Sequence, residues 1–512
     1  MKRGKHWAGE AEGLATDQGP LRGNEMATMQ TVTVDPSMFR EYDIRGLVNR
    51  QLTEPVLEEI GKAYGTYLAA LRARGCGGGD PGPGRVAVGR DVRLESPRYA
   101  RALIAGLRAT GADVVDVGQV PTPLVYFAVN HLKTDGGAAV TASHNPPEYN
   151  GLKLRKRVPG QPNGLPLLPD EIQALRTLAQ QGPFRDRGGA PPGALRAQDI
   201  VEAYVAYVKG RVRLARKLKV VVDAGNGVAG PVAARVLAEI GCDVVALFCD
   251  PDGTFPNHLP DPLKKENLRA LIAKVKETRA DLGLALDGDG DRLGVVDDQG
   301  DVLWADRYLI LLARQVLREH PGAAIVFDVK CSMALEEEIE RMGGRPVMSR
   351  TGYPNVMARR REVDGRLAGE LSGHIFFSDP VIDFDDGTFA GANLLQAVAQ
   401  EDGPLSRIVA SLPKYEATEE ERPRCPDDQK FAVVEQLRAE FRRDPRVTRI
   451  IDLDGARVHY ADGWGLVRAS NTGPELTTRF EAVTKERVEA IRREFRERLA
   501  EFPAVDLTPG GH

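Results

Sequence analysis

The stretch that decides the fold is Val220-Val221-Val222-Asp223-Ala224-Gly225-Asn226-Gly227, in which a β-branched run ends at an aspartate beside a turn. The same pattern occurs at Val86-Ala87-Val88-Gly89-Arg90-Asp91 and at Ile325-Val326-Phe327-Asp328. Each copy is followed by a helical pattern and then by a second apolar strand pattern. A strand–helix–strand unit used three times predicts three similar α/β domains.

After Pro413 the pattern changes to a charged stretch, 415–428, and to short strands that lack crossover helices. The expected strands of this part are 450–451, 458–460, 465–469 and 476–482, and the expected helices are 431–441 and 485–502. Strands without intervening helices favour a mainly antiparallel sheet. We therefore expect a smaller α+β domain at the C-terminus.

A chain of 512 residues exceeds the size of a single hydrophobic core, so several domains are expected. The Gly/Pro-rich segment 182–193 and the turn 297–301 are the other predicted boundaries. The first 30 residues are charged and lack an apolar segment of the secretory type. The expected division is 1–32, a disordered or non-native extension; 33–190, 191–298 and 299–413, α/β domains with mixed sheets; and 414–512, the α+β domain, around a central cleft.

The composition argues against several classes of partner. The chain has 69 basic and 73 acidic residues, so no overall field favours nucleic acid or an anionic membrane. No apolar run approaches the ~20 residues that cross a bilayer. The 5 cysteines are scattered and form no C-x-x-C, which favours reduced thiols in a cytoplasmic protein and argues against a zinc site.

A candidate metal loop, Asp287-Gly288-Asp289-Gly290-Asp291-Arg292, follows the predicted strand 282–286. Alternating glycines let a tight loop turn three carboxylates toward one point, and hard oxygen ligands suit Mg²⁺. An EF-hand is excluded because the sixth residue is Arg292 instead of glycine and the flanking segments are predicted strands. The alternative is an acidic hairpin turn without a metal.

A candidate nucleophile, Ser143, lies in Thr141-Ala142-Ser143-His144-Asn145-Pro146, just after the predicted strand 137–140. Pro146 disfavours helix at Asn145, so we expect a turn that exposes the Ser143 Oγ. No Ser-His-Asp triad is implied, because adjacent side chains in extended backbone point apart and no G-x-S-x-G is present. A turn serine is usually only a cap. The metal loop is what favours phosphoryl transfer.

Together with Gly369-Glu370-Leu371-Ser372-Gly373-His374 and Arg468-Ala469-Ser470-Asn471-Thr472-Gly473, these motifs resemble the α-D-phosphohexomutase superfamily, most closely its bacterial phosphomannomutase/phosphoglucomutase branch. The resemblance runs from Phe39 to the C-terminus. It implies a phosphoserine at Ser143 and a Mg²⁺ ion bound by that residue with Asp287, Asp289 and Asp291. It also implies phosphoryl transfer between O1 and O6 of a hexose through a bound hexose 1,6-bisphosphate, which acts as intermediate and activator.

The resemblance assigns further roles. Arg45 would lie near the phosphoserine, and Lys153 and His374 match candidate general acid/base positions. Glu370 and Ser372 would bind sugar hydroxyls. The other implied substrate-binding residues are Tyr42, Arg292, Lys330, Thr351, Gly352 and Tyr353, together with a clamp for the non-reacting phosphate made of Arg468, Ser470, Asn471 and Thr472.

The preferred sugar stays open at this point. In Arg350-Thr351-Gly352-Tyr353 this chain has Arg and Tyr where mutases of the family often have Lys and His. The Glu370-Leu371-Ser372 motif favours mannose or glucose phosphates over phosphoglucosamine, whose mutases usually carry Gln at the middle position. Phosphoglucosamine mutase is the nearest rival, followed by a non-catalytic sugar-phosphate sensor and a phosphatase. The expected partners are small hexose phosphates and no nucleic acid or membrane, for a cytoplasmic monomer or homodimer.

Overall fold

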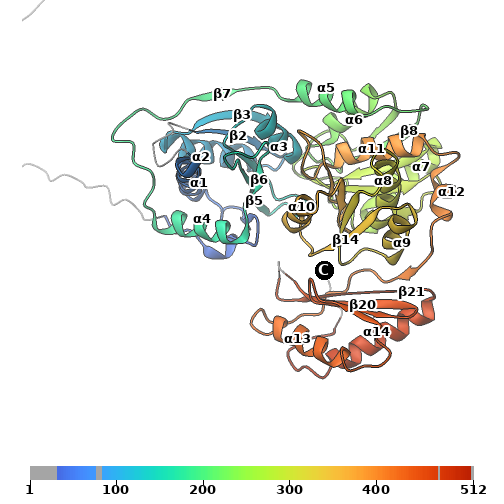
Figure 1. Ribbon diagram of the computed structural model, residues 1–512. Coiled ribbons are helices and arrows are strands. Elements are labelled where there is room, and N and C mark those ends of the chain that lie inside the picture. The colour runs from blue at the N-terminus through green and yellow to red at the C-terminus, as the bar shows by residue number, and fades with distance from the viewer. Residues whose placement is uncertain (1–31, 76–83, 471–472, 509–512) are drawn as a thin grey trace, which may run out of the picture.

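The computed structural model describes residues 32–75, 84–470 and 473–508 and folds them around four separate sheets (Figure 1). Three of the sheets mix parallel and antiparallel neighbours, and the fourth is antiparallel throughout. The expected fold class is therefore confirmed. Within the described ranges, no helix combines the length and apolar character that crossing a membrane requires.

The first sheet has the order β1-β5-β4-β2-β3-β7, with β6 paired to β5. One face packs on α1, α2 and α4, and the other face packs on α3. The elements are η1 Pro36–Met38, β1 Ile44–Leu47, α1 Glu54–Gly75, β2 Arg85–Arg90, α2 Ser96–Ala109, β3 Asp113–Gln119, α3 Thr122–His131, β4 Gly136–Val140, β5 Tyr149–Lys156, β6 Leu165–Pro166, α4 Pro169–Gln181 and β7 Leu195–Ala197.

The second sheet has the order β12-β11-β10-β8-β9, in which β8, β9 and β10 are parallel and β10 pairs antiparallel with β11. The predicted metal loop joins β10 to β11, at the carboxyl end of a parallel strand. Ligands of open α/β sheets bind at that edge. The elements are α5 Val201–Arg211, β8 Lys219–Asp223, α6 Gly230–Glu239, β9 Asp243–Leu247, η2 Lys265–Leu268, α7 Arg269–Thr278, β10 Leu282–Leu286, β11 Leu293–Asp297 and β12 Val302–Leu303.

The third sheet has the order β14-β13-β15-β16. Strand β13, like β2 and β8, is followed by a helix and a parallel neighbour, so the predicted strand–helix–strand unit occurs three times. The elements are α8 Ala305–Glu319, β13 Ala324–Asp328, α9 Met333–Arg341, β14 Arg345–Ser349, α10 Tyr353–Glu362, β15 Leu367–Gly369, β16 Ile375–Phe377, α11 Gly387–Ala399 and α12 Leu405–Ala410.

The fourth sheet has the order β17-β21-β20-β19-β18. Helices α13 and α14 both cover its apolar face, and Figure 1 shows them on the side that faces away from α9 and β14. The expected helices and strands of this domain are found, within a few residues at their ends. The elements are β17 Glu416–Ala417, α13 Lys430–Phe441, β18 Arg449–Ile451, β19 Ala456–Tyr460, β20 Gly463–Ala469, β21 Leu476–Ala482 and α14 Lys485–Leu499.

The opposite face of the fourth sheet docks on the third domain through buried polar side chains. Arg457 donates to the carbonyls of Val329 and Cys331, both at 2.8 Å, and its guanidinium lies 3.8 Å from the ring centroid of Trp464. Side chains alternate between the faces of a strand, so Arg468, four residues after Trp464 on β20, shares its face. The docking therefore turns Arg468 toward the third domain.

Candidate active site

Ser143 lies in the turn between β4 and β5 and adopts a left-handed backbone conformation, with φ of 52°. Its Oγ donates to Oδ2 of Asp287 at 2.5 Å and lies 3.0 Å from Nδ1 of His144. The expectations that adjacent side chains point apart and that the turn exposes Oγ were wrong. The backbone here is not extended, and Asp287 and His144 cover the hydroxyl, so that the residue is 1% exposed.

Two arginines hold this turn by its backbone. Arg93 donates to the carbonyl of Ser143 at 2.9 Å and to those of Asn145, Pro146 and Tyr149. Arg45 donates to the carbonyl of Ala142 at 2.9 Å. Arg93 was not foreseen from the sequence, where it is one more arginine in a loop. The available signal was its place two residues after the predicted strand pattern that ends at Asp91.

The loop between β10 and β11 concentrates three buried carboxylates, those of Asp287, Asp289 and Asp291, whose ligand oxygens lie within 4.8 Å of one another. Oδ1 of Asp287 accepts from the backbone N–H groups of Gly290, Asp291 and Arg292, at 3.0 to 3.2 Å, which closes the turn. Burial, followed by the two neighbouring aspartates, raises the pKa of Asp287 well above its usual range. A cation would relieve this repulsion.

The donor set fits a hard divalent cation. Oδ1 of Asp289 and Oδ1 of Asp291 are buried without a hydrogen-bond partner among the described residues. Unsatisfied carboxylate oxygens in a buried loop are costly unless a cation or donor fills the space between them. The predicted metal residues therefore meet at one point, together with the Ser143 hydroxyl.

Lys153 of β5 places a positive charge against the aspartates of the metal loop. Its ammonium group lies 2.8 Å from Oδ2 of Asp289 and also bonds to Oδ2 of Asp291. Thr122, at the start of α3, donates its hydroxyl to the same oxygen of Asp289 at 2.6 Å. Although burial opposes the charged form, the aspartates raise the pKa of Lys153 well above its usual range.

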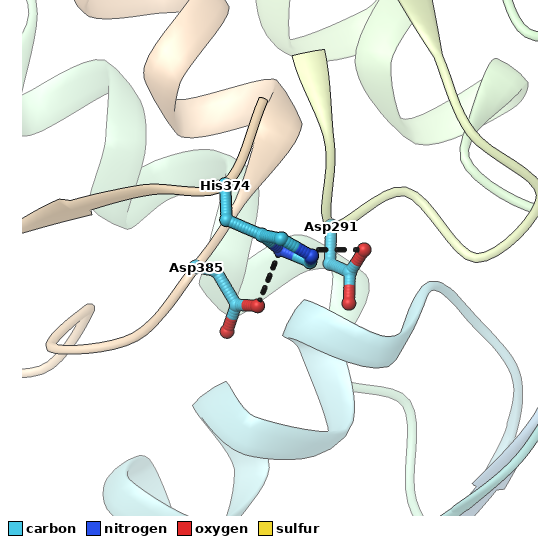
Figure 2. A group of neighbouring side chains, drawn as sticks. All are labelled: Asp291, His374 and Asp385. Carbon is cyan, nitrogen blue, oxygen red and sulfur yellow. Dashed lines mark ion pairs between the residues drawn. The ribbon is translucent and has the colours of Figure 1, made fainter. Parts of the chain in front are cut away.

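His374 joins the third domain to the metal loop. Its Nδ1 lies 2.8 Å from Oδ2 of Asp385 and 3.8 Å from Oδ1 of Asp291, and Figure 2 shows the imidazole between the two carboxylates. Burial works against the ionised form of Asp385, but the His374 imidazole beside it lowers the pKa of Asp385 overall. Asp385 is a second residue that the sequence motifs did not reveal. The backbone of Arg292 bridges to that of His374.

The loops of the third domain bring the expected sugar-binding residues together. The N–H of Gly352 donates to Oε1 of Glu370 at 2.5 Å, and Ser372 donates to Oε2 at 3.4 Å. Tyr42 packs edge-on against Tyr353, with ring centroids 5.0 Å apart. Tyr42 belongs to the first domain, so this contact places the N-terminal motif beside the third-domain loop.

Lys330 of the third domain and Arg468 of the fourth domain lie at the boundary between these two domains. The Lys330 ammonium lies 2.6 Å from Oε1 of Glu420. Nε of Arg468 donates to Oδ2 of Asp454 at 2.8 Å, and the N–H of Ser470 donates to the carbonyl of Glu475. The expected contributions of Asn471 and Thr472 lie outside the described residues. Among the contacts of the described residues, Asp454 is the one that links Arg468 to the third-domain part of the site, through the N–H of Thr351.

The arrangement can perform one kind of chemistry well. It holds a hydroxyl against a loop that could bind a cation, with ammonium, imidazole and guanidinium groups close by, and it sets the Glu370 carboxylate against the Gly352 loop farther along. Offset of negative charge and fixed positioning are what phosphoryl transfer requires. Acyl transfer would need donors aimed at an oxyanion, whereas the loop beside the Ser143 hydroxyl presents three carboxylates.

Sequence models of four phosphoglucomutase/phosphomannomutase domains match the chain in order. The alpha/beta/alpha domains I, II and III match residues 36–186, 202–300 and 304–415, and the C-terminal domain matches residues 420–498. Similar proteins include a phosphomannomutase/phosphoglucomutase of Pseudomonas aeruginosa, 43% identical over 93% of this chain and 98% of the relative. A phosphoglucomutase of Neisseria gonorrhoeae is 40% identical over 91% of this chain and 97% of its own.

The fold comparison agrees. The crystal structure of a phosphoglucomutase/phosphomannomutase family protein from Burkholderia thailandensis matches with a TM-score of 0.83 and 41% identity, covering 93% of this chain and 100% of that one. The four domains occur in the same order as in the sequence models, and the motifs that resemble the superfamily lie on the loops described above. The chain belongs to the phosphoglucomutase/phosphomannomutase family.

Proposed function

We propose that this protein is a phosphohexomutase that moves a phosphoryl group reversibly between O1 and O6 of mannose and/or glucose phosphates. The observation that carries the proposal is the 2.5 Å hydrogen bond from Ser143 Oγ to Asp287, which puts a nucleophilic oxygen on the rim of a loop of three aspartates. The curated relatives that bear phosphomannomutase and phosphoglucomutase names support the same activity.

In the proposed cycle Ser143 carries the phosphoryl group. The P–Oγ bond breaks as a bond forms from phosphorus to the free hydroxyl oxygen of the sugar, whose proton passes to His374. Lys153, an ammonium group held by Asp289 and Asp291, would serve on the acid side by donating to an oxygen that is released. The hexose 1,6-bisphosphate then turns around, its other phosphoryl group returns to Oγ, and the proton goes back to the oxygen that is released. A small amount of free bisphosphate would restore Ser143 when it loses its phosphate.

Asp287, Asp289 and Asp291, with an oxygen of the phosphorylated Ser143, are the proposed ligands of Mg²⁺. When bound there, the ion would offset the negative charge on the transferring group. Arg45 holds the nucleophile turn from the first domain, and Lys153 brings a positive charge beside Asp289 and Asp291.

Recognition of the sugar and of its second phosphate is assigned to the remaining loops. Glu370 and Ser372 would bind two hydroxyls, and the positions that surround them would shape the pocket. Those residues are Tyr42, Arg292, Lys330, Thr351, Gly352 and Tyr353. Arg468 and Ser470, with Asn471 and Thr472, would hold the phosphate that is not reacting, because a guanidinium fork and loop amides suit that anion.

The division into 33–190, 191–298, 299–413 and 414–512 is our proposal for the domain limits, supported by the four matched family domains. We also propose a cytoplasmic monomer or homodimer that acts on small hexose phosphates without a nucleic-acid or membrane partner. The nearly balanced charge, 69 basic against 73 acidic residues, supports the absence of a polyanionic partner.

The decisive experiment follows the isomerisation by ³¹P NMR. The full chain is incubated with Mg²⁺, a trace of glucose 1,6-bisphosphate and, separately, mannose, glucose and glucosamine 1-phosphates. We expect the 6-phosphates to form, fastest with mannose or glucose, and Ser143→Ala to lower the rate by at least about 10³-fold. Ser411→Ala, which removes a hydroxyl that only bonds the carbonyl of Ile408, serves as the matched control.

The other outcomes distinguish the alternatives. Fastest turnover of glucosamine 1-phosphate would make the protein a phosphoglucosamine mutase. Binding without isomerisation by phosphorylated wild type would indicate a sugar-phosphate sensor, and release of inorganic phosphate faster than isomerisation would indicate a phosphatase. Full activity of Ser143→Ala would remove the phosphoserine mechanism.

A further inference from the structure

Asp454, in the turn before β19, connects two domains with one oxygen atom. Its Oδ2 accepts from the backbone N–H of Thr351 at 3.0 Å and from Nε of Arg468 at 2.8 Å. Beside it, Nε of Arg350 donates to the carbonyl of Leu453 at 2.9 Å. A short segment of the fourth domain is thus bonded to the loop of the third domain that contains Arg350 and Thr351.

The turn that carries Asp454 requires a glycine at the next position, Gly455. Gly455 has φ of +86°, and a Cβ built on it would lie 2.3 Å from the carbonyl oxygen of Val467. The turn therefore lies directly against β20 at Val467, one residue before Arg468. The Arg468 side chain is 7% exposed and that of Asp454 13% exposed, so each largely buried charge needs the other.

The loop held by Asp454 continues directly to the proposed sugar site. Thr351 donates its hydroxyl to Oδ2 of Asp328 at 3.2 Å, and the next N–H, that of Gly352, bonds Oε1 of Glu370. A chain of hydrogen bonds thus runs from Arg468 through Asp454 and this loop to Glu370. Its two ends are the residues assigned to the phosphate and to the hydroxyls of one substrate molecule.

We propose that Asp454 is a positioning residue for substrate binding, which holds Arg468 through Nε and fixes its distance from the Thr351–Gly352 loop. The inference rests on the proposed function, because it takes Arg468 as the phosphate clamp. Holding a guanidinium through Nε orients the two terminal nitrogens, which are the pair that bonds a phosphate in fork geometry. One substrate is then reached at its phosphate and at its hydroxyls together.

Asp454 has two opposite effects on the affinity for the substrate phosphate. Its negative charge repels a phosphate nearby, and its bond to Arg468 reduces the freedom that the arginine would lose on binding. The hydrogen bond to Thr351 indicates that orientation wins, because a carboxylate that takes a donor from each domain has part of its charge compensated. The sign of the change in KM decides between the two effects.

The test measures KM and kcat of the full chain with Mg²⁺, bisphosphate and the better hexose 1-phosphate. We expect Asp454→Ala to raise KM about tenfold and to leave kcat within about twofold, with Asp454→Asn in between. If Asp454 acts through Arg468, the double variant Asp454→Ala/Arg468→Ala has the same KM as Arg468→Ala alone. Phosphorylation of Ser143 by the bisphosphate should stay at the wild-type level in every variant.

Asp452→Ala is the matched control, because Asp452 lies two residues away, its side chain is 51% exposed and it pairs with Arg442 on the surface. Its KM should not change. An unchanged or lower KM for Asp454→Ala or Asp454→Asn, or multiplicative effects in the double variant, would overturn the inference while the function stands. A wild-type KM for Arg468→Ala would instead remove the clamp from the proposed function. If Asp454→Ala fails to fold, Asp454→Asn decides.

Discussion

At the scale of single residues, Arg93 shows how the nucleophile turn is held. It donates to four backbone carbonyls and lies 3.2 Å from Asp91, with 2% of its side chain exposed. A lysine keeps the charge but not the planar fork that reaches several carbonyls at once. We expect Arg93→Lys to lower kcat about 10²-fold, since a small displacement of a reacting atom has an effect of that size.

The matched control for this prediction is Arg90→Lys, at the end of β2, three residues before Arg93. Arg90 pairs with Asp116 at 3.2 Å, and its side chain is 25% exposed. Steady-state kinetics on both variants, with circular dichroism to establish folding, should show a loss of kcat only for Arg93→Lys. Equal kcat in the two variants would mean that the Ser143 turn keeps its shape without the guanidinium.

The sequence predicted part of this site and not the rest, for a physical reason. Ser143 and the aspartates of the metal loop carry rare local patterns, so their chemistry could be inferred although 144 positions separate Ser143 from Asp287. Arg93, Asp385 and Asp454 have ordinary neighbours in the sequence. Only the folded chain brings them to Ser143, His374 and Arg468, and a single sequence contains no signal for such pairs.

At the scale of elements, periodic apolar strands were predicted well, and charged or very short ones were not. β10 and β13 are uninterrupted buried runs, as expected. β5 was missed because it reads as polar; Lys153, Arg155 and Lys156 are nonetheless buried, since other segments supply carboxylate and carbonyl partners. β6, β12 and β17 have two residues each, which is too short for any alternation to be detected.

Packing of α1 on α2 gives a prediction at this scale. A Cβ on Gly106 would lie 2.0 Å from the carbonyl oxygen of Glu58, so the two helices touch through their backbones. Alanine favours a helix by about 1 kcal/mol over glycine, but separating two packed helices costs about 1–3 kcal/mol or more. Because the neighbour at 2.0 Å is a backbone oxygen, the cost lies toward the upper end of that range, and we expect Gly106→Ala to lower the free energy of unfolding by about 1–2 kcal/mol, measured by urea denaturation.

Gly210 in α5 provides the control, because the same substitution there should change the free energy of unfolding in the opposite direction. A Cβ built there meets nothing within 4 Å, so helix propensity acts alone. Gly210→Ala should raise the free energy of unfolding by about 0.5–1 kcal/mol. If Gly106→Ala also raised the free energy of unfolding, helices α1 and α2 could move apart without loss of stability, and the prediction would be wrong.

At the scale of the whole molecule, charged side chains join the fourth domain to the third, beside an apolar contact of Val329 with Trp464 and Leu466. Arg479 donates to the carbonyl of Lys330, and the Lys330 ammonium bonds Glu420, in the segment that leads into the fourth domain. Removing one partner of such a buried pair leaves the other charge uncompensated. The docking of this domain should therefore depend on the ionisation of Glu420.

Burial would raise the pKa of Glu420, but the attraction of Lys330 outweighs it and lowers the pKa from 4.5 to about 2. The folded protein thus binds this proton less tightly than the unfolded chain, so the pair's stabilisation is fully present above pH 4.5 and is lost as the pH falls toward 2. The shift corresponds to at most about 3 kcal/mol.

We expect Glu420→Gln to lower the midpoint of urea unfolding at pH 7, and the difference from wild type to shrink below pH 4.5. Glu419→Gln, which removes a 71% exposed partner of Lys265, should have little effect at either pH. A difference between wild type and Glu420→Gln that stays constant from pH 7 to pH 3 would show that packing of the side chain, and not its charge, holds the domain.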